Sequence, residues 1–107
     1  MILISKFLVP KGYTGITIFP FVFLKSKILK KDMVLVNHES IHLRQQMELL
    51  IIPFYLFYVI EFLIRLIQYK NRNLAYRNIS FEREAYANEK DLNYLKSRSF
   101  GAFINYL

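Results

Sequence analysis

The chain has 107 residues, which predicts a single domain, residues 1–107, with one modest core. Hydrophobic residues make up 54% of it, so the composition argues against intrinsic disorder, and the absence of cysteine excludes disulfides, thiolate metal sites and a cysteine nucleophile. The net charge is +7, but Lys and Arg are scattered and form no nucleic-acid-binding motif. We therefore expect no nucleic-acid partner and interpret the charge as a solvated surface, with attraction to an anionic membrane or an acidic partner as the alternative.

The N-terminal part predicts a small sheet. Residues 1–9 are apolar but short and contain Lys6, so we predict no secretory signal and expect a cytoplasmic location. Residues 16–24 (ITIFPFVFL) are β-branched and aromatic, which is typical of a strand. Pro20 cannot donate a hydrogen bond to a sheet, so this strand should lie at an edge or contain a bulge. We expect it to pair with residues 2–9.

Three helices follow a charged connection at residues 25–32. They are predicted over residues 34–52, 54–69 and 80–96, because Pro53 ends or kinks the first and residues 71–73 are a polar break. Ser80 is the expected N-cap of the third helix. Glu61 and Arg65 are four residues apart, a spacing that supports an ion pair. The aromatic tail, residues 97–107, is expected to pack back on the body.

Residues 49–67 are apolar enough to suggest a membrane helix. Their uncharged part covers only residues 49–60, well short of the roughly 20 residues that cross a bilayer. A helix that spanned alone would also place His42 and any ligand after residue 70 on opposite sides of the membrane. We therefore expect a buried core helix, with Tyr55 and Tyr58 in the core. A helix embedded in or lying on a membrane is the alternative, and membrane association is not favoured.

Residues 38–42 read HESIH, an H-E-x-x-H motif that contains both histidines of the chain. Residues four apart share one face of a helix, so His38 and His42 can offer two imidazoles to one Zn²⁺. Glu39 would then lie beside the metal, placed to take a proton from its bound water. Gln45 and Gln46 follow within a turn and are expected to be solvated or capping residues, with a place in the lining of the cleft as the alternative for one of them.

A catalytic zinc site usually has three protein ligands and one open position. Without cysteine or a third histidine, the third ligand must be Asp or Glu. Glu82 and Glu84 open the third predicted helix and point about 200° apart around it, so only one of them can face the metal. Glu89 shares the face of Glu82 and is a better candidate for supporting a ligand than for being one.

The two segments HESIH at residues 38–42 and EREAY at residues 82–86 resemble the gluzincin metallopeptidases, which carry H-E-x-x-H on one helix and a Glu ligand on a later one, often as E-x-x-A-D. Tyr86 stands where the family usually has an Asp that steadies a ligating histidine. The length is similar to that of the minigluzincins, some of which are latent. The resemblance implies Glu82 as third ligand and an upstream edge strand that binds extended peptide.

The predicted fold class is therefore α+β: three main helices with a small N-terminal β-sheet whose edge strand borders the active-site cleft. The predicted function is a zinc metalloendopeptidase, with Zn²⁺ as cofactor and a peptide or protein as substrate. His38, His42 and Glu82 hold the metal, and Glu39 is the general base. Two alternatives are a catalytically latent zinc-binding protein and a small membrane-associated protein.

Overall fold

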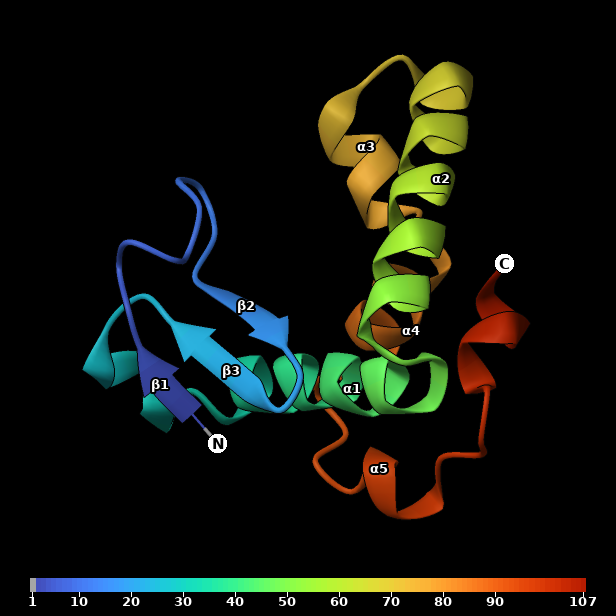
Figure 1. Cartoon of the computed structure of the whole chain (residues 1–107). Coiled ribbons are helices and arrows are strands. Elements are labelled where there is room, and N and C mark those ends of the chain that lie inside the picture. The colour runs from blue at the N-terminus through green and yellow to red at the C-terminus, as the bar shows by residue number, and fades with distance from the viewer. Residues whose placement is uncertain (1) are drawn as a thin grey trace.

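The N-terminal segment forms a three-stranded mixed sheet in the computed structural model, which describes residues 2–107. β1 (Ile2–Ile4) pairs in parallel with β3 (Phe21–Leu24), and β2 (Gly15–Ile18) pairs with β3 in antiparallel register. The strand order is β1-β3-β2, so β2 lies at an edge of the sheet (Figure 1). The helices follow the sheet in the chain, and the predicted α+β class is confirmed.

The prediction of one continuous strand over residues 16–24 is wrong. β2 and β3 are the two arms of a hairpin in which Ile18 pairs with Phe21, so Pro20 lies in the turn rather than in a strand. A turn suits a residue that has no N–H to donate. The expected pairing with residues 2–9 is confirmed for β1, which pairs with β3.

α1 (Met33–Leu49) follows a short 3₁₀ helix, η1 (Lys27–Lys31), which lies in the charged connection. The Asp32 carboxylate caps α1 by accepting from Leu35 N at 3.1 Å. α1 ends three residues before the predicted boundary because Leu50 adopts φ 67° and α2 begins directly after it. Pro53 therefore lies in the first turn of α2, where a missing N–H costs little.

α2 (Ile51–Tyr69) rises from the end of α1 (Figure 1), and its C-cap residue, Lys70, has a left-handed backbone conformation. The prediction that it is a buried core helix is wrong, because Phe54 is its only fully buried residue. Its outer side is exposed and apolar. By length and composition α2 is long and apolar enough to cross a membrane, the one such helix within residues 2–107.

The side chain of Glu61, which lies on α2, caps the N-terminus of α4 (Ser80–Asn88). Its carboxylate accepts from Ser80 N at 2.8 Å and from the Ser80 hydroxyl. Ser80 is thus the first residue of α4 rather than its cap, and the predicted Glu61–Arg65 ion pair is wrong, since Arg65 instead donates to Gln68. A carboxylate at a helix N-terminus satisfies its free N–H groups and suits the helix dipole.

α3 (Arg72–Arg77) begins where a polar break was predicted, because the Asn71 side chain accepts from Leu74 N at 3.1 Å and caps it. α4 ends at Asn88, well before the predicted residue 96, and a separate short helix, α5 (Tyr94–Ser97), follows. The Asn37 amide of α1 donates to carbonyls of residues 88, 89 and 91, which holds the chain where it leaves α4.

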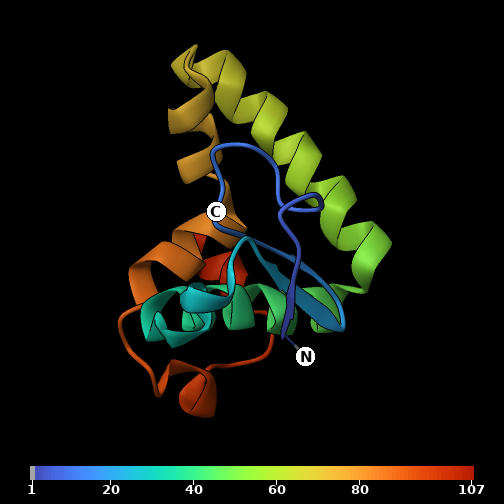
Figure 2. The same ribbon diagram turned by 90° about the vertical axis from the view of Figure 1, so that its left-hand side faces the viewer.

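The apolar core lies between α2, α4 and the C-terminal tail. Phe54, Ile79 and Phe81 form its buried centre. Phe103, in the 3₁₀ helix η2 (Ala102–Tyr106), packs on Phe81 with ring centroids 4.7 Å apart. The expected packing of the tail on the body is therefore confirmed, and Figure 2 shows the tail passing below α1 before it returns toward α4.

Candidate metal centre

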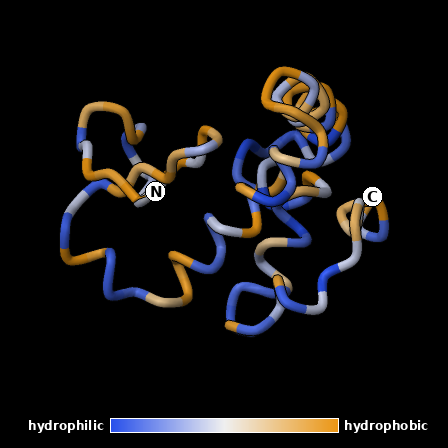
Figure 3. The backbone as a smooth tube through the Cα atoms, turned by 60° about the horizontal axis from the view of Figure 1, so that its bottom comes forward, coloured by the Kyte–Doolittle hydropathy of each residue, from blue (hydrophilic) through white to orange (hydrophobic). Residues whose placement is uncertain are grey.

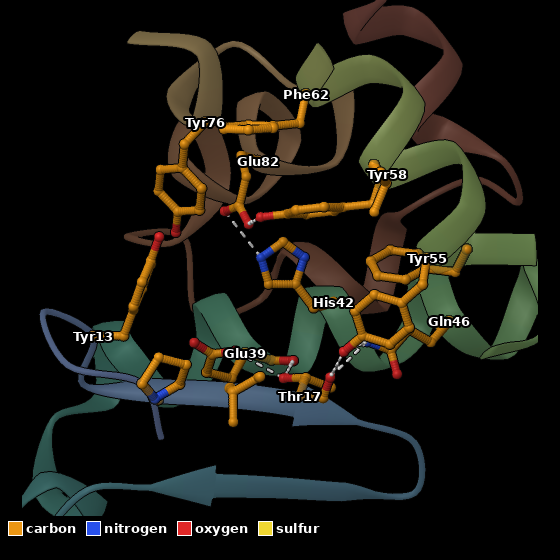
Figure 4. A pocket seen from close by; sticks show the side chains of 15 residues that line it. Tyr13, Thr17, Glu39, His42, Gln46, Tyr55, Tyr58, Phe62, Tyr76 and Glu82 are labelled. Atoms are coloured by element: carbon orange, nitrogen blue, oxygen red, sulfur yellow. Dashed lines mark hydrogen bonds and ion pairs between the residues drawn. The ribbon is translucent and has the colours of Figure 1, made fainter. Parts of the chain in front are cut away.

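α1 and α4 bring two histidines and one carboxylate together in the interior. His38 Nε2 and His42 Nε2 are 3.2 Å apart, and Glu82 Oε1 lies 3.3 Å from the first and 3.1 Å from the second. All three side chains are buried. Figure 4 shows His42 and Glu82 facing each other across the upper part of a pocket.

The three atoms have the spacing that one tetrahedral metal ion requires. Bonds of about 2.0–2.1 Å from zinc to nitrogen or oxygen place neighbouring ligand atoms about 3.3 Å apart in a tetrahedron. The observed separations of 3.1–3.3 Å match one face of that tetrahedron. Two imidazoles and one carboxylate are also a donor set typical of catalytic zinc, so these residues fit the ion.

The site keeps Glu82 ionised and His42 cationic when only the protein groups are present. Burial would lower the pKa of His42, but the charge of Glu82 and its hydrogen bond raise it to about 9. Burial would raise the pKa of Glu82, but the two histidines hold it well below its usual range. A metal ion would take the place of the proton between these groups, since ligating imidazoles must be neutral.

Neighbouring side chains orient each ligand. Tyr58 donates to Glu82 Oε2 at 2.7 Å, which leaves Oε1 facing the histidines. Burial, and then the charge of Glu82, raise the pKa of Tyr58, so its hydroxyl stays a donor. Glu89 Oε1 lies 3.4 Å from His38 Nδ1, in the supporting position that its place on the helix face predicted.

Gln45 orients His42. Its amide nitrogen donates to Glu84 Oε1 at 2.9 Å and to Phe81 O at 3.1 Å, so its amide oxygen must face His42 Nδ1, 2.8 Å away. In the neutral form of His42, which a metal ion requires, the proton is then on Nδ1 and Nε2 has a free lone pair. The expectation that Gln45 is solvated is wrong, since it is completely buried.

Tyr86 stands where the gluzincin pattern has Asp, and it does not take over that hydrogen bond. Its ring meets the His38 ring edge-on, with centroids 4.6 Å apart, and its hydroxyl lies 3.2 Å from that of Tyr76. Glu89, three residues further along, lies closest to the Nδ1 atom that the family's Asp would support. Tyr86 packs against the ligand instead.

Glu39 lies beside the three ligands and is held by β2. Thr17 donates to Glu39 Oε2 at 2.7 Å, and Glu39 is buried. A Cβ atom at Gly15 would lie 3.3 Å from Glu39 Oε1 and 3.0 Å from Leu24, so the strand approaches this carboxylate closely because Gly15 has no side chain. Thr17 was not predicted as a site residue, and no motif in the sequence marks it.

A cavity of about 340 Å³ opens beside the metal centre (Figure 4). Glu39, His42 and Glu82 form its polar part. The rest is largely aromatic and comes from the loop before β2, from β2 itself, and from α2 and α3: Tyr13, Ile16, Tyr55, Tyr58, Phe62 and Tyr76. Tyr55 and Tyr58 pack against the core cluster, as the sequence predicted, and they also line the cavity. The edge strand borders the cavity through Gly15, Ile16 and Thr17, as predicted.

The edge of β2 is partly occupied by the protein itself. In an antiparallel pair, every second residue directs its backbone N–H and C=O away from the neighbouring strand. In β2 these residues are Gly15 and Thr17, whose backbone groups face away from β3. The Thr17 carbonyl already accepts from Gln46 at 2.7 Å and from the Tyr55 hydroxyl at 2.6 Å, and Gln46 also accepts from Phe19 N. Gln46 is thus a buried residue that fastens the hairpin to α1, and the prediction of a solvated side chain is wrong.

Glu84, the rival third ligand, lies away from the metal centre. It is fully buried and binds Arg98, Tyr94 and Gln45. The helix geometry that allowed only one of Glu82 and Glu84 to face the histidines therefore describes the structure correctly. Glu84 supports the site indirectly, through Gln45.

No protein-family model matches the chain, and neither a curated protein nor a solved structure matches it.

Proposed function

We propose that the protein is a zinc-dependent peptidase of the gluzincin type. His38, His42 and Glu82 hold the metal. The observation that carries the proposal is the triangle of ligand atoms 3.1–3.3 Å apart, with the Glu39 carboxylate beside it at the edge of a cavity. A structural zinc site would be closed by a fourth protein ligand. Within residues 2–107 the group comprises three, which leaves room for water.

Zinc bound by these three residues would acidify a water molecule and polarise a peptide carbonyl. Glu39 accepts the proton as a general base and passes it to the leaving amine. Thr17 holds Oε2 of Glu39, so Oε1 is the atom that moves the proton. Gln45 and Glu89 keep the imidazoles oriented, and Tyr58 keeps the Glu82 carboxylate from turning.

The expected substrate is an extended peptide with an apolar side chain in the aromatic cavity. Its backbone would pair with the edge of β2 at Gly15, because the Thr17 carbonyl already has two donors. That occupied carbonyl also favours a second candidate function: a zinc-binding protein that does not hydrolyse peptides because part of the substrate-binding edge is closed.

Hydrolysis of a fluorescent unfolded protein, measured together with zinc content, tests the proposal. Glu39→Gln should keep one zinc per chain, since Glu39 is not a ligand, and lose at least about a hundredfold in rate. Asp91→Asn is a matched change at an exposed carboxylate, and it should keep both the zinc content and the hydrolysis rate of the wild type. Zinc-loaded wild type that hydrolyses no faster than a control without protein would support the second candidate. Wild type and Glu39→Gln that are equally active above that background would contradict the role of Glu39.

A further inference from the structure

The outer side of α2 is an exposed surface without a polar residue. Eight side chains form this surface, which we call the α2 outer face: Ile52, Leu56, Phe57, Val59, Ile60, Leu63, Ile64 and Ile67. At 100° per residue they cover an arc of about 160°, and at 1.5 Å per residue they extend for about 24 Å. Figure 3 shows α2 at the upper right with much of its length in orange. Contiguous apolar patches of this kind mark interaction sites.

The opposite side of the same helix is bound within the protein. Phe54 is buried in the core, Tyr58 donates to Glu82, and Glu61 caps α4. α2 is therefore held by its inner side along the first half of its length. Whatever covers the outer face must lie against it from outside, with α2 remaining in place.

The charges on the surface are almost all positive. Of the fifteen Lys and Arg residues only Arg98 is buried, whereas of the eight carboxylates only Asp32 and Asp91 are exposed. The tip of α2 continues this pattern, because exposed Tyr69, Lys70 and Arg72 follow the outer face and the chain has no carboxylate between Glu61 and Glu82. An apolar face beside basic residues and a tyrosine suits the interface of an anionic bilayer.

We propose that the α2 outer face docks the protein on an anionic lipid bilayer, with α2 lying along the membrane surface. A second copy is a poorer occupant, because each copy has a net charge of +7 and would repel the other. A spanning α2 would need to break the Tyr58–Glu82 and Glu61–Ser80 hydrogen bonds and bury the Glu61 carboxylate in lipid. It would also separate α1 from α4.

Flotation of the full chain with lipid vesicles tests the docking independently of zinc and hydrolysis. The wild type should float with vesicles of equimolar phosphatidylcholine and phosphatidylglycerol. It should bind vesicles of phosphatidylcholine alone more weakly, and high salt should weaken the binding to anionic vesicles. An alkaline carbonate wash should release it, because α2 lies on the surface and does not span.

The triple variant Leu56→Gln, Leu63→Gln, Ile67→Gln should lose at least about tenfold in vesicle partitioning. These side chains are 51% to 77% exposed, so helical circular dichroism and zinc content should not change. The matched control Phe7→Gln, Ile28→Gln, Phe100→Gln replaces side chains that are 74% to 92% exposed elsewhere and should still float. The three single α2 variants give the same test if the triple variant unfolds.

Three results would overturn the proposal. They are wild-type protein that stays unbound with anionic vesicles, a triple variant that floats like the wild type, and protein that resists the carbonate wash. A dimer in solution that the α2 triple variant dissociates, together with no flotation of the wild type, would assign the outer face to a second copy instead.

Discussion

At the scale of single residues, Gln45 sets the chemistry of His42 although it never touches the metal position. Its amide is fixed by two acceptors on α4, Phe81 O and Glu84 Oε1, and its oxygen therefore accepts from His42 Nδ1. A neutral imidazole that donates from Nδ1 has a free lone pair on Nε2, and this is the form that binds metal.

Gln45→Met should lower zinc affinity by about ten- to a hundredfold, because the substitution keeps the side-chain volume but removes the acceptor that orients His42. Competition with a fluorescent zinc chelator measures the affinity. The matched control is Gln46→Met, since the Gln46 amide binds the β2–β3 hairpin and neither histidine. It should change zinc affinity much less. Equal losses in both variants would mean that Gln45 acts only through general packing.

The sequence predicted the residues that meet at the candidate site more fully than it predicted their support. His38 and His42 are four apart on one helix, and Glu82 and Glu84 point to different sides of another, so local geometry pairs the histidines and allows only one of the two carboxylates to face them. The choice of Glu82 came from the gluzincin resemblance. Thr17, Gln45 and Gln46 owe their roles to partners 22 to 39 residues away in the chain. Such partners are set by tertiary packing, which a local pattern does not contain.

At the scale of elements, a buried cluster of charges fastens the C-terminal tail to α1 and α4. The Arg98 guanidinium binds both oxygens of Glu84 and reaches Glu48 Oε2 at 2.7 Å, and its side chain is fully buried. Burial would raise the pKa of Glu84, but Arg98 and the other donors hold it below its usual value. The cluster continues through Gln45 to His42, so the tail supports the site.

Arg98→Met should destabilise the fold by about 3–5 kcal/mol at pH 7, because it leaves two carboxylates buried without their cation. Glu84 has a lowered pKa in the folded protein, so its contribution is present above its ordinary value of 4.5 and is lost as pH falls through the lowered value. The deficit of the variant should therefore shrink as pH falls below neutral, when its unpaired carboxylates take up protons. Urea unfolding of the wild type and the variant at a series of pH values below neutral measures this deficit in the free energy of unfolding.

Arg83→Met is the control for this prediction. Arg83 also binds the tail, through Tyr106 O, but its other partner is the Asn78 amide and no carboxylate lies in its contacts. Arg83→Met should lower the free energy of unfolding by about 1 kcal/mol, which is in the range of one hydrogen bond. This loss should be independent of pH between 4 and 7. A deficit of Arg98→Met that stays constant with pH would contradict the role of the charges.

The elements were predicted by type more accurately than by boundary. Pro20 was assigned to a strand because both flanking segments favour strands, and only pairing between β2 and β3 reveals the turn. The end of α4 depends on Asn37, which binds carbonyls beyond it from another helix. Glu61 looks like a partner for Arg65 within α2, and instead caps α4. Each difference arises from a contact between elements.

At the scale of the whole molecule, α2 separates two environments. Its inner side supplies Tyr55, Tyr58 and Phe62 to the cavity beside the metal centre, and its outer side is exposed and apolar. Hydropathy of residues 49–67 could not distinguish a core helix from this arrangement, because the sequence does not say which side the rest of the chain covers. The proposed docking would bring the cavity close to a membrane surface.

The central claim is that one metal ion joins α1 to α4 through three side chains. Crystals grown with zinc and measured on both sides of the zinc absorption edge test it most directly. We expect one anomalous peak about 2.0–2.2 Å from Nε2 of His38, Nε2 of His42 and Oε1 of Glu82. No peak at this position, or a peak bound by other side chains, would contradict it.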